Sequence, residues 1–79
     1  MRLDKYLKIS RLIKRRTVAN EACDAERVSV NGKSARASYE VKEGDIIEIR
    51  MGVNAVKVKV LRVAEHVTKE LSSSMYMPL

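Results

Sequence analysis

The sequence predicts an α+β domain in which two packed helices precede a small, twisted antiparallel sheet. Apolar residues recur at helical spacing up to about residue 25, and the period then switches to two. A strong two-residue hairpin signal, Asn31-Gly32, interrupts the alternating stretch. With 79 residues, the chain has room for one domain and one core.

The first expected helix runs from Asp4 to about Ile9. Leu3, Tyr6 and Leu7 share one side of it, which makes Tyr6 a core aromatic rather than a base-stacking platform. Asp4 lies in the first turn, where a carboxylate suits the positive end of the helix dipole. Residues 10–16 then form a tight connector, and its Leu12 and Ile13 are expected to turn inward.

A second helix is expected from near Thr17, as its N-cap, to about Ala25. Its apolar face is made of small side chains, so the two helices can approach closely; these are Val18, Ala19, Ala22, Cys23 and Ala25. Cys23 is interpreted as a small core residue. A lone cysteine and a charged start without a signal peptide indicate a reducing cytosol.

The strands follow from alternation. Val28 and Val30 lead into the Asn31-Gly32 turn, and residues 33 to about 35 form the return strand. A turn at 43–45 precedes the strand 46–51, in which Ile47, Ile49 and Met51 are expected to share one face. After a turn at 52–55, residues 56–60 alternate without a fault and should pair with 46–51.

Beyond residue 63 the pattern weakens. Residues 64–71 could form one or two helical turns, and the serine run at 72–74 suggests a frayed tail. We therefore expect a domain over residues 1–63 and a partly disordered C-terminal extension over 64–79. Tyr76 is a candidate partner contact within that tail.

The charge is concentrated at one end of the chain. The first twenty residues hold seven cations and one acid, Asp4, and thus account for the whole net charge of +6. Such a pole attracts polyanions. The cations are Arg2, Lys5, Lys8, Arg11, Lys14, Arg15 and Arg16.

Four segments carry a family resemblance: RLDKYL, SRLIKRRTVANEA, RVSVNGK and VKEGDIIEI. In order and spacing they resemble the ribosomal protein S4-type RNA-binding domain, which is built around the two-helix alpha-L motif, over roughly residues 1–62. The start Met1-Arg2-Leu3-Asp4-Lys5, and the lack of an attached catalytic domain, resemble the stand-alone bacterial ribosome quality control factors of the heat-shock ribosome-recycling factor group.

That resemblance implies a protein that binds the rRNA of stalled large ribosomal subunits and the peptidyl-tRNA that they still carry. It also implies a partner, an RqcH-like tailing factor that adds a C-terminal alanine tail to the nascent chain. The protein is expected to act in the cytoplasm as a ribosome-associated monomer. No apolar run approaches the roughly 20 residues that span a bilayer.

The resemblance also ranks the candidate RNA-binding residues. Arg2 and Arg16 come first, as the positions that match the family's RNA contacts, and Arg11, Lys14 and Arg15 come next. Lys5 and Lys8 are expected to steer RNA. The hairpin can present Lys33, and with it Arg36, to a phosphate. Asp4 is expected to orient a neighbouring arginine or to contact a partner.

One departure from the family pattern concerns the end of the second helix. A glycine is common there, whereas this chain has Ala25-Glu26-Arg27. If Glu26 takes a positive φ, the conformation costs on the order of 1 kcal/mol.

The sequence holds no phosphate loop, dinucleotide fingerprint or nucleophile motif, so we expect a binding module without cofactor or metal. His66 has no second ligand at metal-binding spacing. Three alternatives remain open: a heat-shock-type factor that recycles peptidyl-tRNA-bearing subunits without tailing, a DNA-binding helix-turn-helix regulator, and an RNA-modifying enzyme. The acidic, short second helix disfavours the regulator, and the chain length disfavours the enzyme.

Overall fold

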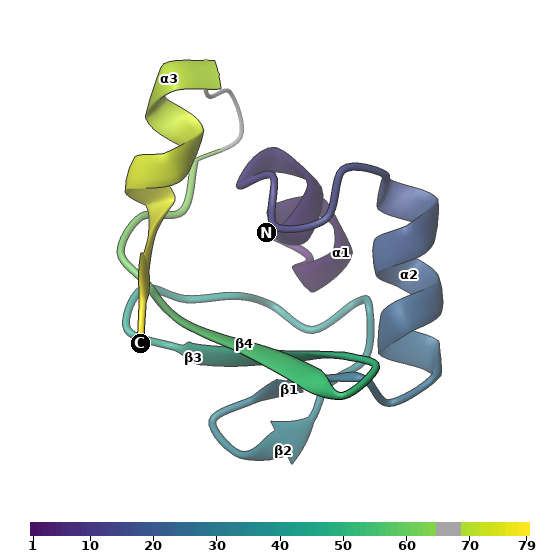
Figure 1. Cartoon of the computed structure of the whole chain (residues 1–79). Coiled ribbons are helices and arrows are strands. Elements are labelled where there is room, and N and C mark those ends of the chain that lie inside the picture. Colours follow the sequence, from purple (N-terminus) through teal and green to yellow (C-terminus); the bar gives the residue numbers. More distant parts are fainter. Residues whose placement is uncertain (65–68) are drawn as a thin grey trace.

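The computed structural model describes residues 1–64 and 69–79 and shows two helices packed beside an antiparallel sheet (Figure 1). Helix α1 spans Leu3–Ile9 and helix α2 spans Arg16–Asp24. The strands are β1 (Val28–Val30), β2 (Lys33–Ser34), β3 (Ile46–Met51), β4 (Asn54–Val60) and β5 (Tyr76–Pro78). Helix α3 (Lys69–Ser72) and a 3-10 helix, η1 (Ser73–Met75), precede β5. The predicted α+β class is confirmed.

The five strands lie in the order β2-β1-β3-β4-β5, and every neighbouring pair is antiparallel. Helices α1 and α2 cover one face of this sheet (Figure 1). On that face Val28 lies opposite Ile49, and Ile47 lies opposite Val30 in β1 and Val58 in β4. All five side chains are buried, so the predicted alternation of these strands is confirmed.

The core lies between the helices and the sheet. Leu3, Tyr6 and Leu7 of α1 are fully buried, as are Ile47 and Val58. Fully burying such a side chain stabilises the fold by about 1.5–3 kcal/mol. The hydroxyl of Tyr6 is also satisfied, because it donates a hydrogen bond to the carbonyl oxygen of Met75 at 2.8 Å. The prediction that Tyr6 is a core aromatic is confirmed.

The hairpin between β1 and β2 has the predicted turn. Asn31 and Gly32 have φ values of 53° and 84°, as a type I′ turn requires. The side chain of Asn31 also contacts β3, since its Oδ1 accepts a hydrogen bond from the backbone N–H of Ile46 at 3.0 Å. Its Nδ2 donates to Oδ1 of Asp45 at 3.1 Å. The turn is thereby tied to the start of β3.

Asp45 is a buried carboxylate that the sequence did not reveal as an anchor. Its Oδ2 accepts hydrogen bonds from the Tyr39 hydroxyl at 3.1 Å and from the backbone N–H of Lys42 at 2.9 Å. Burial, together with the hydrogen bond to Asp45 and its negative charge, raises the pKa of Tyr39. This network holds the long connection between β2 and β3 against the sheet.

Helix α2 differs from its prediction at its start and on its face. It begins at Arg16, with Arg15 in the cap position, so Thr17 as N-cap is wrong. Ala19 and Cys23 are buried as expected, but Val18 is 46% exposed and Ala25 is exposed. Arg16 and Asn20 turn toward α1, as described below, and this rotation carries Val18 to the edge of the interface.

The hairpin of β3 and β4 is tighter than expected. The turn consists of Gly52 and Val53 alone, because Met51 already pairs with Asn54. Gly52 takes a φ of 62°, which glycine adopts without a steric penalty. Met51 alternates in step with Ile47 and Ile49 but is 46% exposed, because it lies at the end of the sheet beside this turn.

The C-terminal residues do not fray at the serine run as expected. Ser72 is buried, and the chain continues through η1 into β5, which pairs with β4 so that Tyr76 lies opposite Val60. Met75 is fully buried in the core. The expected helical turns at 64–71 correspond in part to α3, whereas residues 65–68, His66 among them, lie outside the described residues. The domain boundary at residue 63 stays a prediction.

Two residues other than glycine follow the helices in a left-handed conformation. Arg11, after α1, has a φ of 64°, and Glu26, after α2, has a φ of 60°. Around Glu26, the backbone N–H of Arg27 bonds to the carbonyl of Ala22 and that of Glu26 to the carbonyl of Cys23, which is a Schellman motif. Glu26 therefore stands where the family commonly has glycine, and it adopts the positive φ that is unfavourable for a residue other than glycine.

Candidate nucleic-acid interface

The basic end of the molecule is organised around one buried acid, Asp4, which is 2% exposed. Its Oδ1 accepts hydrogen bonds from the backbone N–H of Lys5 at 2.8 Å and from Nε of Arg2 at 3.2 Å. Its Oδ2 accepts from Nε of Arg16 at 3.3 Å and from Nδ2 of Asn20 at 3.4 Å. One carboxylate thus joins both helices.

The surroundings of Asp4 keep it ionised. Burial by itself would raise its pKa, but hydrogen bonds from Asn20, Arg16 and the backbone of Lys5, with the charge of Arg16, outweigh that effect. The pKa of Asp4 is therefore lowered. At neutral pH the carboxylate is a fixed negative centre between two arginines.

This geometry decides how the arginines meet solvent. The side chains of Arg2 and Arg16 are 52% and 48% exposed, so about half of each is accessible to solvent. Each is bonded to Asp4 through its Nε. A guanidinium presented in this way can bind a phosphate through two parallel hydrogen bonds.

The backbone places Arg2 as firmly as the side chains do. The N–H of Leu3 donates to the carbonyl of Tyr39 at 2.8 Å, and the N–H of Val41 donates to the carbonyl of Met1 at 2.9 Å. Arg2 itself pairs with Glu40 in an isolated antiparallel bridge. The connection between β2 and β3 therefore serves as a support for the start of α1.

The structure gathers some of the predicted RNA-binding residues and separates others. Arg2, Lys5 and Arg16 line one shallow hollow together with Ser38 and Glu40. Four further cations are exposed along the end of α1 and the connector that follows it; these are Lys8, Arg11, Lys14 and Arg15. Lys33 is exposed on β2, in the hairpin, and belongs to a different part of the surface.

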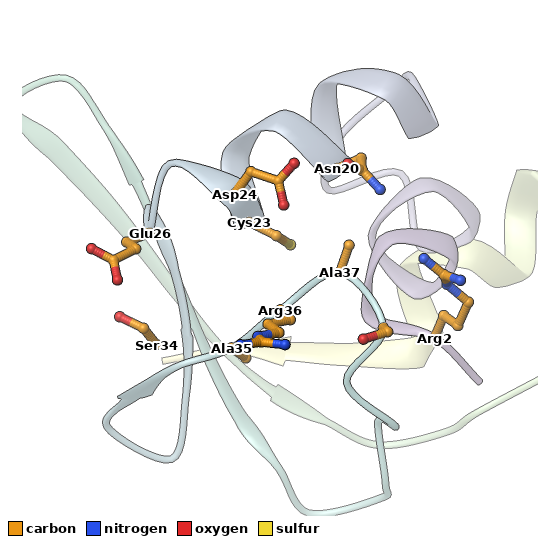
Figure 2. A pocket seen from close by; sticks show the side chains of 10 residues that line it. Arg2, Asn20, Cys23, Asp24, Glu26, Ser34, Ala35, Arg36 and Ala37 are labelled. Carbon is orange, nitrogen blue, oxygen red and sulfur yellow. The ribbon is translucent and has the colours of Figure 1, made fainter.

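A groove continues from Arg2 between α2 and residues 34–38 (Figure 2). Arg2 lies at one end of it and Glu26 at the other. Arg36, which the sequence suggested only alongside Lys33, lines this groove with Arg2, and the acids Asp24 and Glu26 line it too. Burial, with the negative charges of Asp4 and Asp24, raises the pKa of Cys23 to about 11, so its thiol stays protonated.

Two polar residues of this surface were not predicted from the sequence as part of the site. Asn20 reaches Asp4 from α2, and Ser38 lines both the hollow and the groove. Asn20 could have been found, because it lies four residues after Arg16 and so shares its helix face. Ser38 gave no such signal, because only the tertiary fold brings it beside Arg2.

Comparison with known proteins places the fold and this surface in a family. The S4 domain family matches residues 1–47, which include helices α1 and α2 and the first hairpin. The chain belongs to the S4-domain proteins and, within them, to the family of the RQC P-site tRNA stabilizing factors, also called RqcP. The sequence-based resemblance is confirmed.

The relatives match over nearly the whole chain. The RQC P-site tRNA stabilizing factor of Halalkalibacterium halodurans is 54% identical over 96% of this chain and 86% of its own. That of Bacillus subtilis is 50% identical over 96% of this chain and 88% of its own. Among solved structures, trimeric Heat Shock Protein 15 of Vibrio cholerae superposes with a TM-score of 0.91 at 25% identity, over 100% of this chain and 81% of its own.

Proposed function

We propose that this protein acts in ribosome-associated quality control as a non-enzymatic RNA-binding factor. It binds rRNA of the large ribosomal subunit and stabilises the tRNA in the P site. The observation that supports this most directly is the pair Arg2 and Arg16, held by Asp4 with each side chain about half exposed. The names of relatives that are at least 50% identical, each a P-site tRNA stabilizing factor, supply the biological setting.

The proposal extends to the state of the ribosome. The bound subunit carries a peptidyl-tRNA after translation has stalled, and holding that tRNA allows an RqcH-like factor to add alanine residues to the nascent chain. The protein works as a monomer in the cytoplasm. Among the described residues, no helix has the length and apolar content to cross a membrane.

The cations of this surface are proposed to have two different roles, long-range attraction of RNA and precise positioning on it. The net charge of +6 draws the protein to RNA, and Lys5, Lys8 and the connector cations contribute to this attraction. Arg2 and Arg16 set the register, because their side chains are anchored on Asp4. With about five phosphate contacts, raising salt from 50 to 200 mM weakens binding by roughly two orders of magnitude.

The test is co-sedimentation with large subunits that carry peptidyl-tRNA. Arg2→Ala and Arg16→Ala should each move the protein to the top of the gradient while circular dichroism shows a folded chain. Each variant leaves Asp4 one arginine partner, which limits the structural damage. Arg62→Ala, an exposed cation beyond β4, is the matched control and should sediment like the unchanged protein. If both arginine variants stay with the subunits, the assigned surface is wrong.

A second candidate function is supported by the close likeness to Heat Shock Protein 15. In this alternative the protein recycles subunits that carry peptidyl-tRNA and takes no part in tailing. Deleting the gene separates the two functions, because loss of alanine tails on stalled peptides supports the tailing role. Unchanged tails, with accumulation of peptidyl-tRNA on free large subunits, would favour recycling.

A further inference from the structure

A second hollow, of about 390 Å³, lies on the other side of α2 from the arginine pair. We call it the apolar groove; its floor and walls include Leu12, Val18, Ala22, Ile49 and Met51. Val18 and Ala22 point away from Arg16 and Asn20, because the helical spacing of 100° per residue sets the two pairs on different faces. The groove therefore lies apart from the Arg2–Arg16 pair, and Leu12 joins it to the connector that carries Arg11 and Lys14.

Several apolar side chains here are open to solvent. Val18 and Met51 are each 46% exposed, and Val53, at the tip of the adjoining β3–β4 turn, is fully exposed. These residues come from a helix and a hairpin that meet only in the folded chain (Figure 1). Clustered exposed apolar residues indicate an interaction site, and a methionine at its edge can adapt to a partner's shape.

The rim of the apolar groove has one sign of charge. Arg27 and Arg50 line it, and the backbone holds them side by side, because the N–H of Arg50 donates to the carbonyl of Arg27 at 2.8 Å. Among the described residues that line the groove, none is acidic and none is aromatic. Without an aromatic ring, the groove offers a base only the two arginine planes to stack on, whereas its apolar lining suits aliphatic side chains.

We propose that the apolar groove docks an acidic amphipathic helix of a protein partner. The helix would place a row of aliphatic side chains in the groove, at the i, i+3 or i+4 and i+7 spacing that such grooves select. Carboxylates beside that row would meet Arg27 and Arg50. The protein would then join RNA on one face of α2 to a protein on the other. This inference does not depend on the proposed ribosomal function.

The test uses the full chain, labelled for nuclear magnetic resonance, and two synthetic helical peptides. Both peptides carry the same leucine row, and they differ only in flanking glutamates or flanking lysines. The glutamate peptide should shift the methyl signals of Val18, Ala22 and Met51 and bind roughly tenfold more tightly than the lysine peptide. The double variant R27E/R50E should reverse that preference.

Two variants distinguish specific binding in the apolar groove from nonspecific hydrophobic binding of the peptide elsewhere on the surface. Met51→Glu should abolish peptide binding and leave the fold intact, because the side chain is already half exposed. Met77→Glu is the matched control, since Met77 is 43% exposed on β5, and it should bind the peptide unchanged. Equal affinity for both peptides, or loss of binding in both methionine variants, overturns the proposal.

Two further outcomes would also overturn the proposal, because each would show that a different molecule occupies the apolar groove. If single-stranded oligouridine shifts the same methyl signals and displaces the peptide, the groove binds RNA. If those signals move on dilution of the protein alone, a second copy of this chain fills the groove.

Discussion

Arg2 and Arg16 bond to opposite oxygens of one buried carboxylate, with their Nε atoms 3.2 and 3.3 Å from Oδ1 and Oδ2 of Asp4. Two cations that would repel each other are thereby held on neighbouring helices. Both side chains lose part of their freedom when the protein folds rather than when RNA binds. Such preorganisation lowers the entropic cost of association.

Replacing Asp4 with asparagine should weaken both the fold and the interface. The side chain keeps its shape, but the arginines lose a charged acceptor and their mutual repulsion is no longer compensated. We expect a loss of about 1.5–3 kcal/mol in the free energy of unfolding, since hydrogen bonds to charged groups are worth about that much. Urea unfolding measures this loss, and sedimentation with large subunits should show weaker binding at a temperature where the variant is folded.

The matched control is Asp24→Asn, which removes an exposed carboxylate from the same helix pair without touching the arginines. Its stability should change by less than about 0.5 kcal/mol. If the two variants bind large subunits equally well, then Asp4 does not position the arginines.

The lowered pKa of Asp4 predicts a stability effect in acid. Because the folded pKa lies below the ordinary value of 3.8, the contribution of this carboxylate is fully present above that value. It is lost as pH falls through the folded pKa, when the carboxyl takes up a proton. Melting temperatures of the native chain and of Asp4→Asn should therefore differ at pH 6 and converge in strong acid. A difference that persists unchanged at pH 2 would contradict this assignment.

Local sequence patterns were sufficient for the helices, the central strands and the first hairpin. The period of two fixed the inward faces of β1 and β4, and Asn31-Gly32 fixed the turn because few other pairs adopt positive φ at both positions. The charge count located the basic pole. The family resemblance, not the charge, ranked Arg2 and Arg16 first, and their RNA contact remains a prediction.

What the sequence could not show depends on contacts between distant residues. Tyr39 and Asp45 gave no periodic signal, yet they anchor the longest connection. Met75 follows a serine run that looks disordered, and its burial depends on Tyr6 at the other end of the chain. The pairing of Asp4 with Asn20 likewise requires the two helices to be packed first. Periodicity does not encode such pairs.

The two left-handed residues after the helices should respond differently to glycine. Glu26→Gly and Arg11→Gly each relieve a φ near 60°, so each should raise the free energy of unfolding by about 0.5–1 kcal/mol. Glu26→Gly should leave binding to large subunits intact. Arg11→Gly should weaken it, because it also removes a connector cation. Thermal melts paired with sedimentation separate the two effects, and a stabilised Arg11→Gly that binds normally would remove Arg11 from the interface.

The burial of Met75 predicts that the C-terminal residues belong to the folding unit. Its side chain is fully buried and its carbonyl accepts the Tyr6 hydroxyl, so β5 is tied to α1 through the core. Met75→Ala should cost about 2–5 kcal/mol, a large part of the stability of a domain this small. Met77→Ala, on exposed β5 surface, should cost less than about 0.5 kcal/mol. Urea unfolding measures the free energy of unfolding of both variants. If the C-terminal residues were a dispensable extension, both substitutions would lower that free energy by the same small amount.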